Sequence, residues 1–279
     1  MEKIGIAIIT CNRENYFTKC IKSIPFDLIH TTVIVNDGKR YPLQNMLASD
    51  DVHIIQHEEN KGVAVSKNDG LKFLIDNGCT HLFIIEDDME ILDYLVFDKY
   101  INAAKVSGIK HLNYGPGSPF NRKQKIKDFD LHNRHLLDED SEVNPKAIID
   151  YGKGVTIALY EHTVGMFTYY HKDVIEKIGY IPTCYEQCWE HVCSTQDAIT
   201  AGFHPPFWWF ADIANSHLML APQAGAINNS CIAEKRDKWM ENVSKFTYEN
   251  CEVFICDNSL TRDYYVDLKN RYKDFPKPF

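Results

Sequence analysis

The chain has 279 residues, 44% hydrophobic and 25% charged, a composition that excludes the disordered and collagen-like classes. Its longest apolar runs, Ile4 to Ile9 and Leu82 to Ile85, are shorter than the roughly 18 residues that cross a membrane, and the N-terminus has no signal-peptide pattern, so we expect a cytoplasmic protein. The net charge of -9 disfavours nucleic-acid binding through the overall field, and nine cysteines without a C-x-x-C pair indicate reduced thiols rather than disulfides or zinc.

The first hundred residues alternate strand and helix patterns with short links, which predicts an α/β sheet covered on both faces. The expected strands are apolar and β-branched runs: Ile4 to Thr10, Thr32 to Val35, Val52 to Gln56 and His81 to Ile85. The expected helices have apolar residues at helical spacing: Arg13 to Ile24, and Gly62 to Asn77 with Gly78 as its C-cap.

Beyond Ile91 the pattern is less regular. A long polar stretch at 115–146 is typical of a lid, a binding loop or an insert. Around it the sequence predicts a helix at Tyr94 to Val106, strands at Lys110 to Tyr114, Ala147 to Asp150 and Val155 to Tyr160, helices at Lys172 to Ile178 and Val192 to Ala201, and an amphipathic helical tail from Glu234.

Three consecutive carboxylates, Glu86, Asp87 and Asp88, follow the fourth expected strand. Like charges at one strand end repel one another unless a cation or hydrogen bonds compensate. Mg²⁺ in proteins is usually held by one or two carboxylates together with substrate phosphates. The triplet therefore predicts a divalent metal beside a diphosphate, and the alternative is an acidic surface turn.

Other polar segments also follow expected strands, and ligands of open α/β sheets bind beyond the carboxyl ends of the strands. We expect these segments to converge on one crevice with Glu86 to Asp88: Thr10 to Arg13, Asn36 to Gly38, and His57 to Gly62.

In their order and spacing, these segments resemble the donor-binding half of a GT-A glycosyltransferase, closest to the inverting family 2. The resemblance implies a GT-A-like, Rossmann-like three-layer domain with a mixed, mostly parallel sheet, and a nucleotide-sugar donor, with a UDP-sugar favoured. It places Thr10, Asn12 and Arg13 in the nucleotide pocket, Asp37 at the base or ribose, and Asn60, Gly62 and Lys67 near the ribose and diphosphate.

The triplet matches the D-x-D element of that family as Glu86-x-Asp88. By this resemblance Asp88 is the direct ligand of Mn²⁺ or Mg²⁺, and Glu86 reaches the ribose or a metal-bound water. Asp87 stands among the donor-binding residues by position, but we expect it to face solvent in a turn. A late histidine ligates the metal in many members of the superfamily, and His217 is the candidate here.

The acceptor side of the family has a small-residue strand, a helix, a Gly-Phe-like turn and an acidic pair. This chain has Val164 to Phe167, then Val174 to Tyr180, then Glu190-His191 where the family usually reads Glu-Asp. An inverting transfer needs a general base, for which Glu190 is the first choice and His191 and Asp197 are alternatives. Trp189 and Trp209 are candidates for stacking on a sugar, whereas we expect Trp208 in the core.

We therefore expect a catalytic domain over residues 1–225, with a donor half at 1–110 and an acceptor half at 111–225, and a helical extension at 226–279. The expected activity is metal-dependent transfer of a sugar to a hydroxyl, with inversion, on a glycan or glycolipid acceptor. One alternative acceptor is a hydroxylated base in DNA, with Arg122 to Lys127 meeting phosphate. The alternative of another class is a non-catalytic nucleotide- or carbohydrate-binding module.

Overall fold

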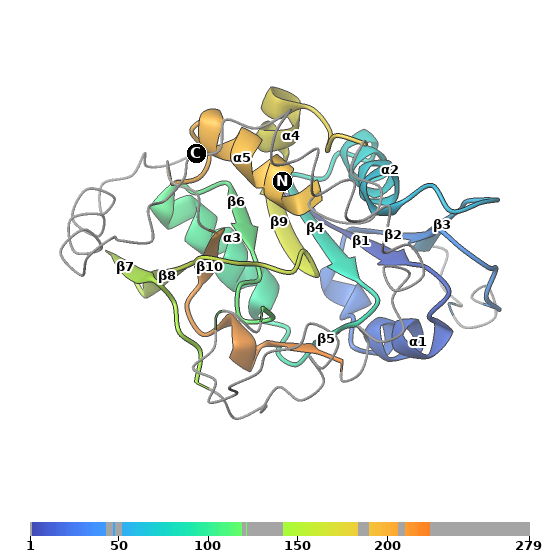
Figure 1. Ribbon diagram of the computed structural model, residues 1–279, viewed down its shortest axis with the longest axis horizontal. Helices are drawn as coiled ribbons and strands as arrows, with labels where there is room; N and C mark the ends of the chain where they lie inside the picture. The colour runs from blue at the N-terminus through green and yellow to red at the C-terminus, as the bar shows by residue number, and fades with distance from the viewer. Residues whose placement is uncertain are drawn as a thin grey trace, which may run out of the picture.

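The computed structural model describes residues 2–42, 47, 52–118, 121, 142–183, 190–205 and 210–223. A central sheet is built from six strands: β1 (Ile4–Thr10), β2 (Thr31–Asn36), β3 (Val52–Gln56), β4 (His81–Glu86), β6 (His111–Asn113) and β9 (Phe167–His171). Their order in the sheet is β3-β2-β1-β4-β9-β6 (Figure 1). The first four are parallel, and β9 runs antiparallel to its neighbours β4 and β6. The predicted mixed, mostly parallel α/β sheet is confirmed.

Both faces of this sheet are covered, which is why its strands are continuous apolar runs rather than alternating ones. In β1, Ile6 and Ile8 pack into one core with α1 (Glu14–Lys22) and α3 (Val96–Ser107). The intervening residues of β1 pack into a second core with three helices on the opposite face: α2 (Val63–Asp76), α4 (Lys172–Ile178) and α5 (Glu190–Thr200) (Figure 1). The result is a three-layer arrangement.

Two smaller sheets complete the described part of the molecule. The first is antiparallel and consists of β7 (Ala147–Gly152), β8 (Val155–Tyr160) and β10 (Phe210–Ile213), with α3 packed against β8 and β10. The second pairs β5 (Met89–Ile91) with β11 (Leu220–Pro222), which places the chain around residue 220 directly beside the acidic triplet. Two short 3-10 helices, η1 (Phe26–Leu28) and η5 (Ser216–Leu218), lie in the connections.

The expected helices and strands of the first hundred residues agree with the structure to within about two residues at most ends, the usual uncertainty of element boundaries. Gly78 follows α2 with φ 75°, as expected for a helix C-cap. The small-residue strand expected at Val164 to Phe167 is misplaced, because β9 begins only at Phe167. Strands β5, β10 and β11 were not predicted.

Much of the expected loop at 115–146 and the whole tail after residue 223 lie outside the described residues. Within the described part, no helix is long and apolar enough to cross a membrane. The expected halves, 1–110 and 111–225, share the central sheet, since β6 and β9 come from the second half. Their division at residue 110 stays a prediction.

Candidate active site at the carboxyl ends of the strands

The carboxyl ends of the four parallel strands meet at one edge of the sheet. Thr10 of β1 lies opposite Asn36 of β2, and Asn36 lies opposite Gln56 of β3. On the other side, Ile9 lies opposite Glu86 of β4. The polar segments that follow these strands therefore converge, as the sequence predicts for a ligand site in an open α/β sheet.

Asp87 is fully buried, so the expectation that it faces solvent in a turn is wrong. Its backbone N–H donates to Ile9 O at 3.0 Å, which carries the strand pairing one residue beyond β4 and turns the side chain inward. Thr10 Oγ1 donates to Asp87 Oδ2 at 2.7 Å, and the guanidinium of Arg13 pairs with the other oxygen. Burial raises the pKa of Asp87 to about 7, and Arg13 opposes that shift.

Asp88 shares Arg13 with Asp87 but keeps one oxygen for another ligand. Arg13 Nη1 donates to Asp88 Oδ2 at 2.9 Å. Asp88 Oδ1 is buried and has no hydrogen-bond partner among the described residues. Gln223, at the end of β11, donates its backbone N–H to Asp88 O and its side-chain amide to Asp87 O. The segment after β11 thus holds the triplet in place.

Tyr41 is a member of this site that sequence analysis missed. Its hydroxyl accepts the backbone N–H of Arg13 at 2.6 Å and lies 3.2 Å from Thr10 Oγ1. Burial raises the pKa of Tyr41 to about 12, which keeps the hydroxyl protonated and able to donate. No motif marked this residue, because the contact depends on how the chain after β2 folds back over α1.

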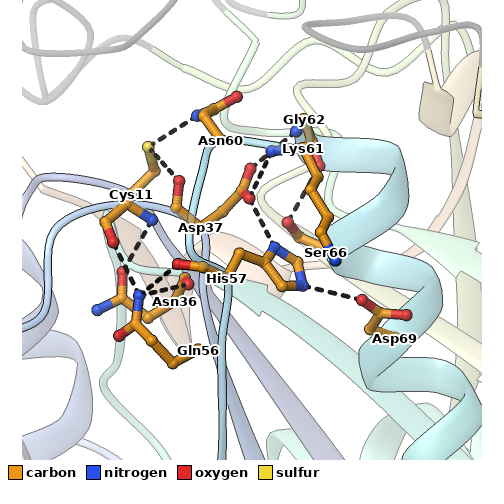
Figure 2. A network of polar contacts seen from close by, with 11 residues as sticks. Cys11, Asn36, Asp37, Gln56, His57, Asn60, Lys61, Gly62, Ser66 and Asp69 are labelled. Carbon is orange, nitrogen blue, oxygen red and sulfur yellow. Dashed lines mark hydrogen bonds and ion pairs between the residues drawn. The ribbon is translucent and has the colours of Figure 1, made fainter.

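Asn12 and Asn60 support the loops of the candidate donor pocket. Asn12 has φ 56°, and its Oδ1 accepts the N–H of Lys39 at 2.8 Å, which joins the segments after β1 and β2. Asn60 Nδ2 lies 3.1 Å from the sulfur of Cys11 (Figure 2). Both side chains lie in the expected segments and here bind protein groups.

Asp37 is the centre of a second buried network (Figure 2). Its Oδ1 accepts the N–H of Lys61 at 2.8 Å, and its Oδ2 accepts the N–H of Gly62 at 2.9 Å. Gly62 is the N-cap residue of α2, so Asp37 places negative charge at the start of a helix, where the macrodipole favours it. His57 contacts the same carboxylate at 2.6 Å.

Lys67 joins the two sides of the candidate site. This lysine is 2% exposed, and its Nζ lies 2.7 Å from Glu86 Oε1 and 2.6 Å from Glu190 Oε1, while donating to Gly165 O at 3.0 Å. All three N–H groups of the ammonium are therefore used. One cation between two carboxylates cannot fully neutralise both. Burial raises the pKa of Glu86 to about 7 against the opposing effect of Lys67.

Glu190 begins the described part of α5 and lies against His191. Burial disfavours its charged form, but Lys67 and His191 outweigh burial and hold the pKa of Glu190 well below its usual range. His191 Nδ1 is 3.3 Å from Glu190 Oε1, and because a carboxylate only accepts, the imidazole donates from Nδ1. Gly165, with φ 66°, makes room for this pair, since a Cβ there would lie 2.8 Å from His191 Nδ1.

Two other expected residues lie apart from this cluster. Asp197 is half-buried in α5, seven residues and hence about 10 Å along the helix from Glu190. His217 lies in η5, just before β11. Among the described residues, no three His, Cys, Asp or Glu side chains gather as a metal site. Metal binding by Asp88 and His217 stays a prediction.

Several expected site residues lie outside the described residues: Trp189, Trp208, Trp209 and the basic run at 122–127.

The model of one family, Glycosyl transferase family 2, matches residues 5–105, the segment from β1 to α3. No curated protein matches the chain in sequence. The solved structure of TarS from S. aureus superposes with a TM-score of 0.50 and 14% identity, over 97% of this chain and 42% of that one. A structure of TarS residues 1-349 in complex with UDP gives a TM-score of 0.50 and 12% identity, over 97% of this chain and 70% of that one.

The chain spans less than half the length of the first of these structures, and at such identities the likeness concerns the fold alone. The family match is independent of it and falls on the segment that carries the expected donor-binding residues and the acidic triplet. The chain therefore has a GT-A-like fold, shared with TarS, and its residues 5–105 match the model of Glycosyl transferase family 2.

Proposed function

We propose that the chain is a nucleotide-sugar-dependent glycosyltransferase that transfers a sugar to an acceptor hydroxyl with inversion at the anomeric carbon. The observation that carries the proposal is the buried Oδ1 of Asp88, which has no hydrogen-bond partner in the described part of the chain and lies at the shared edge of the strands, within the segment that matches family 2. A buried carboxylate oxygen without a partner is costly unless a ligand satisfies it. A divalent cation that also binds a diphosphate supplies that partner.

The donor we favour is a UDP-sugar. The TarS structure that shares this fold was solved with UDP. In this chain, Thr10 and Asp37 lie at the edge where a nucleotide would bind, and Arg13 supplies positive charge there. Because Arg13 already neutralises Asp87 and Asp88 in part, we expect metal and diphosphate to bind together rather than metal alone.

The residues of the triplet suit Mn²⁺ or Mg²⁺. Carboxylate oxygens are the ligands that both ions prefer, and one or two of them suffice when phosphate oxygens and water complete the shell. Asp88 would be the direct ligand, and His217 is a further candidate. A bound cation would stabilise the negative charge that develops on the leaving nucleoside diphosphate.

We assign the general base to His191 and make Glu190 its positioning residue. A carboxylate whose pKa is held low by Lys67 is a weak base, and Glu190 is 2% exposed. With Nδ1–H donated to Glu190, His191 presents the lone pair of Nε2 to an acceptor hydroxyl. Asp197 is two helical turns from this pair, which disfavours it.

The acceptor we favour is a glycan or glycolipid hydroxyl. DNA remains the second possibility; the acidic net charge of -9 opposes it, and the basic run at 122–127 would have to overcome that charge. Retention on immobilised DNA at low salt, lost when the four basic residues of that run are neutralised, would support DNA instead.

The test is to incubate the protein with a panel of nucleotide sugars in Mn²⁺ or Mg²⁺. Hydrolysis of each donor and the thermal stabilisation of the protein by each donor are measured. We expect one donor to be hydrolysed with metal present and Asp88→Asn to abolish both signals. The matched control is Asp98→Asn, the same change at an exposed residue of α3, which should behave like the wild type. Normal donor and metal binding by Asp88→Asn would disprove the metal assignment.

His191→Asn separates catalysis from binding. An asparagine can still donate to Glu190 but cannot accept a proton, so we expect the rate to fall about 10²- to 10⁴-fold with donor affinity unchanged. Glu190→Gln should lower the rate less. Donor binding without hydrolysis or transfer to any acceptor would instead indicate a non-catalytic binding module.

A further inference from the structure

The segment that follows β3 is tied to both β2 and α2 by one buried histidine, His57, which is 3% exposed (Figure 2). Its Nδ1 lies 2.6 Å from Oδ1 of Asp37, at the end of β2. Its Nε2 lies 2.9 Å from Oδ2 of Asp69, in the second turn of α2. Both ring nitrogens therefore face carboxylate oxygens at hydrogen-bonding distance.

A neutral imidazole has one N–H and one lone pair, whereas an ionised carboxylate only accepts. An imidazole flanked by two carboxylates satisfies both contacts only when each of its nitrogens carries a proton. We propose that His57 is a positioning residue that donates from Nδ1 to Asp37 and so fixes Asp37 for donor binding. The part concerning the donor rests on the function proposed above.

The consequence for Asp37 is a difference between its two oxygens. Oδ1 receives two protein donors, the Nδ1–H of His57 and the N–H of Lys61. Among the residues that the structure describes, Oδ2 receives one, the N–H of Gly62. Each carboxylate oxygen accepts about two hydrogen bonds, so Oδ1 is filled and Oδ2 keeps one acceptor position for a hydroxyl or N–H of the donor. His57 thus selects which oxygen of Asp37 faces the ligand.

Asp69 has the supporting role of holding the ring in this orientation. Its side chain is 37% exposed, in contrast to the 4% of Asp37, so water competes for it and it is the weaker of the two anchors. Loss of the Asp69 contact should therefore disturb the site less than loss of the Asp37 contact. Because the Asp37 contact should matter more than the Asp69 contact, two variants of similar size that each keep one of the contacts can test the role of His57.

The two variants are His57→Asn and His57→Gln, because an asparagine amide can replace Nδ1 and a glutamine amide can replace Nε2. We expect His57→Asn to keep the bond to Asp37 and to bind UDP within about threefold of the wild type. His57→Gln should keep only the hydrogen bond to Asp69 and lose the one to Asp37. We expect it to bind UDP about tenfold more weakly, which corresponds to one lost hydrogen bond to a charged group. Thermal unfolding of both variants checks that they fold.

The protonation state is measured separately, without any ligand, by the ¹⁵N spectrum of histidine-labelled protein assigned through the variants. We expect Nδ1 of His57 to carry the proton that is donated to Asp37. A spectrum in which Nδ1 carries no proton would overturn this hydrogen bond, and equal UDP affinity of the two folded variants would overturn the positioning role. If the wild type binds no nucleotide of the panel, the proposed function fails, whereas the spectrum still decides the protonation of His57.

Discussion

Lys67 is the buried cation on which the acidic groups of the site depend. It contacts Glu86 at the end of β4 and Glu190 at the start of α5, and it is 2% exposed. A buried ion pair adds little net stability compared with an apolar pair, but removing one partner leaves an uncompensated buried charge. The role of Lys67 is therefore best measured by its removal.

Lys67→Met should lower the free energy of unfolding by about 3–5 kcal/mol, because the buried Glu190 and the partly buried Glu86 lose their shared cation. Urea denaturation measures this. The control is Lys72→Met in the same helix, where the side chain is 65% exposed and pairs with Asp76 at 3.7 Å; we expect a change within about 0.5 kcal/mol. Adding Glu190→Gln to Lys67→Met should restore part of the loss. Equal effects of the two lysine changes would contradict the argument.

For single residues, the sequence predicted where a side chain lies better than which groups it contacts. Thr10, Asp37 and Asp88 were expected at the carboxyl ends of the strands because each follows an apolar run, and they lie there. The burial of Asp87 was not predictable, because it depends on a strand pairing that continues past β4. The bond between Lys67 and Glu190 joins residues 123 positions apart, and no local pattern encodes it.

Helix α2 shows how one element organises the site. Its residues 67, 68 and 69 point in different directions because successive helical residues are about 100° apart. Lys67 reaches Glu190, Asn68 makes two hydrogen bonds to the backbone of Ile181, and Asp69 reaches His57. The helix was predicted from its apolar spacing, but that spacing describes only the face turned to the sheet. Its polar contacts appear once the fold is known.

Most strands were predicted from apolar, β-branched runs, but β5, β10 and β11 were missed and the start of β9 was misplaced. Strands β5 and β11 have three residues each and β10 has four, which gives little periodic signal, although the three-residue β6 was predicted within a longer run. In β10, Asp212 is nevertheless a junction of several elements. Its carboxylate accepts hydrogen bonds from Tyr100 Oη at 2.5 Å, Ser216 Oγ at 2.6 Å, Gly115 N at 3.1 Å and Ile213 N at 2.8 Å.

Asp212→Asn should destabilise the protein by about 1–3 kcal/mol, because the amide places two N–H donors among groups that donate to this side chain. A protonated carboxyl adds only one donor, which the hydroxyl of Tyr100 or Ser216 can accept. The pH dependence of the difference in unfolding free energy between the wild type and Asp212→Asn shows whether the carboxyl group of Asp212 causes it. Burial raises the pKa of Asp212 to about 7, above the 3.8 of an ordinary aspartate. The folded state therefore holds the proton more tightly, so the stability that Asp212 contributes is complete below pH 3.8 and is lost as the pH rises through about 7.

The measurement is the free energy of unfolding of the wild type and Asp212→Asn at pH 5 and pH 8. The wild type should lose its advantage over the variant as the pH rises, and Asp98→Asn should show no such change. Glu86 and Asp87 also have raised pKa values, but they are present in both proteins and cancel in the difference. An advantage of the wild type that grows with pH would contradict the assignment.

For the molecule as a whole, the central sheet joins the two sides of the candidate site into one unit. β4 carries the acidic triplet and pairs with β1 on one side and with β9 on the other. β9 is followed directly by α4, and Lys67 bonds Gly165 and Glu190 across the same boundary. The sequence suggested a donor half and an acceptor half, and their shared sheet implies that neither half is stable when the other unfolds.

We therefore expect the amides of β1 and β9 to become exposed in the same unfolding event. Native-state hydrogen exchange in increasing urea should give the two strands the same free energy of opening, within about 1 kcal/mol, and the same dependence on urea. UDP with Mn²⁺ at about a hundred times its dissociation constant should then slow exchange about a hundredfold in both strands, although only β1 is adjacent to the proposed nucleotide pocket. Protection confined to β1 would mean that the donor side opens independently, and the division at residue 110 would then be a boundary of stability as well as of function.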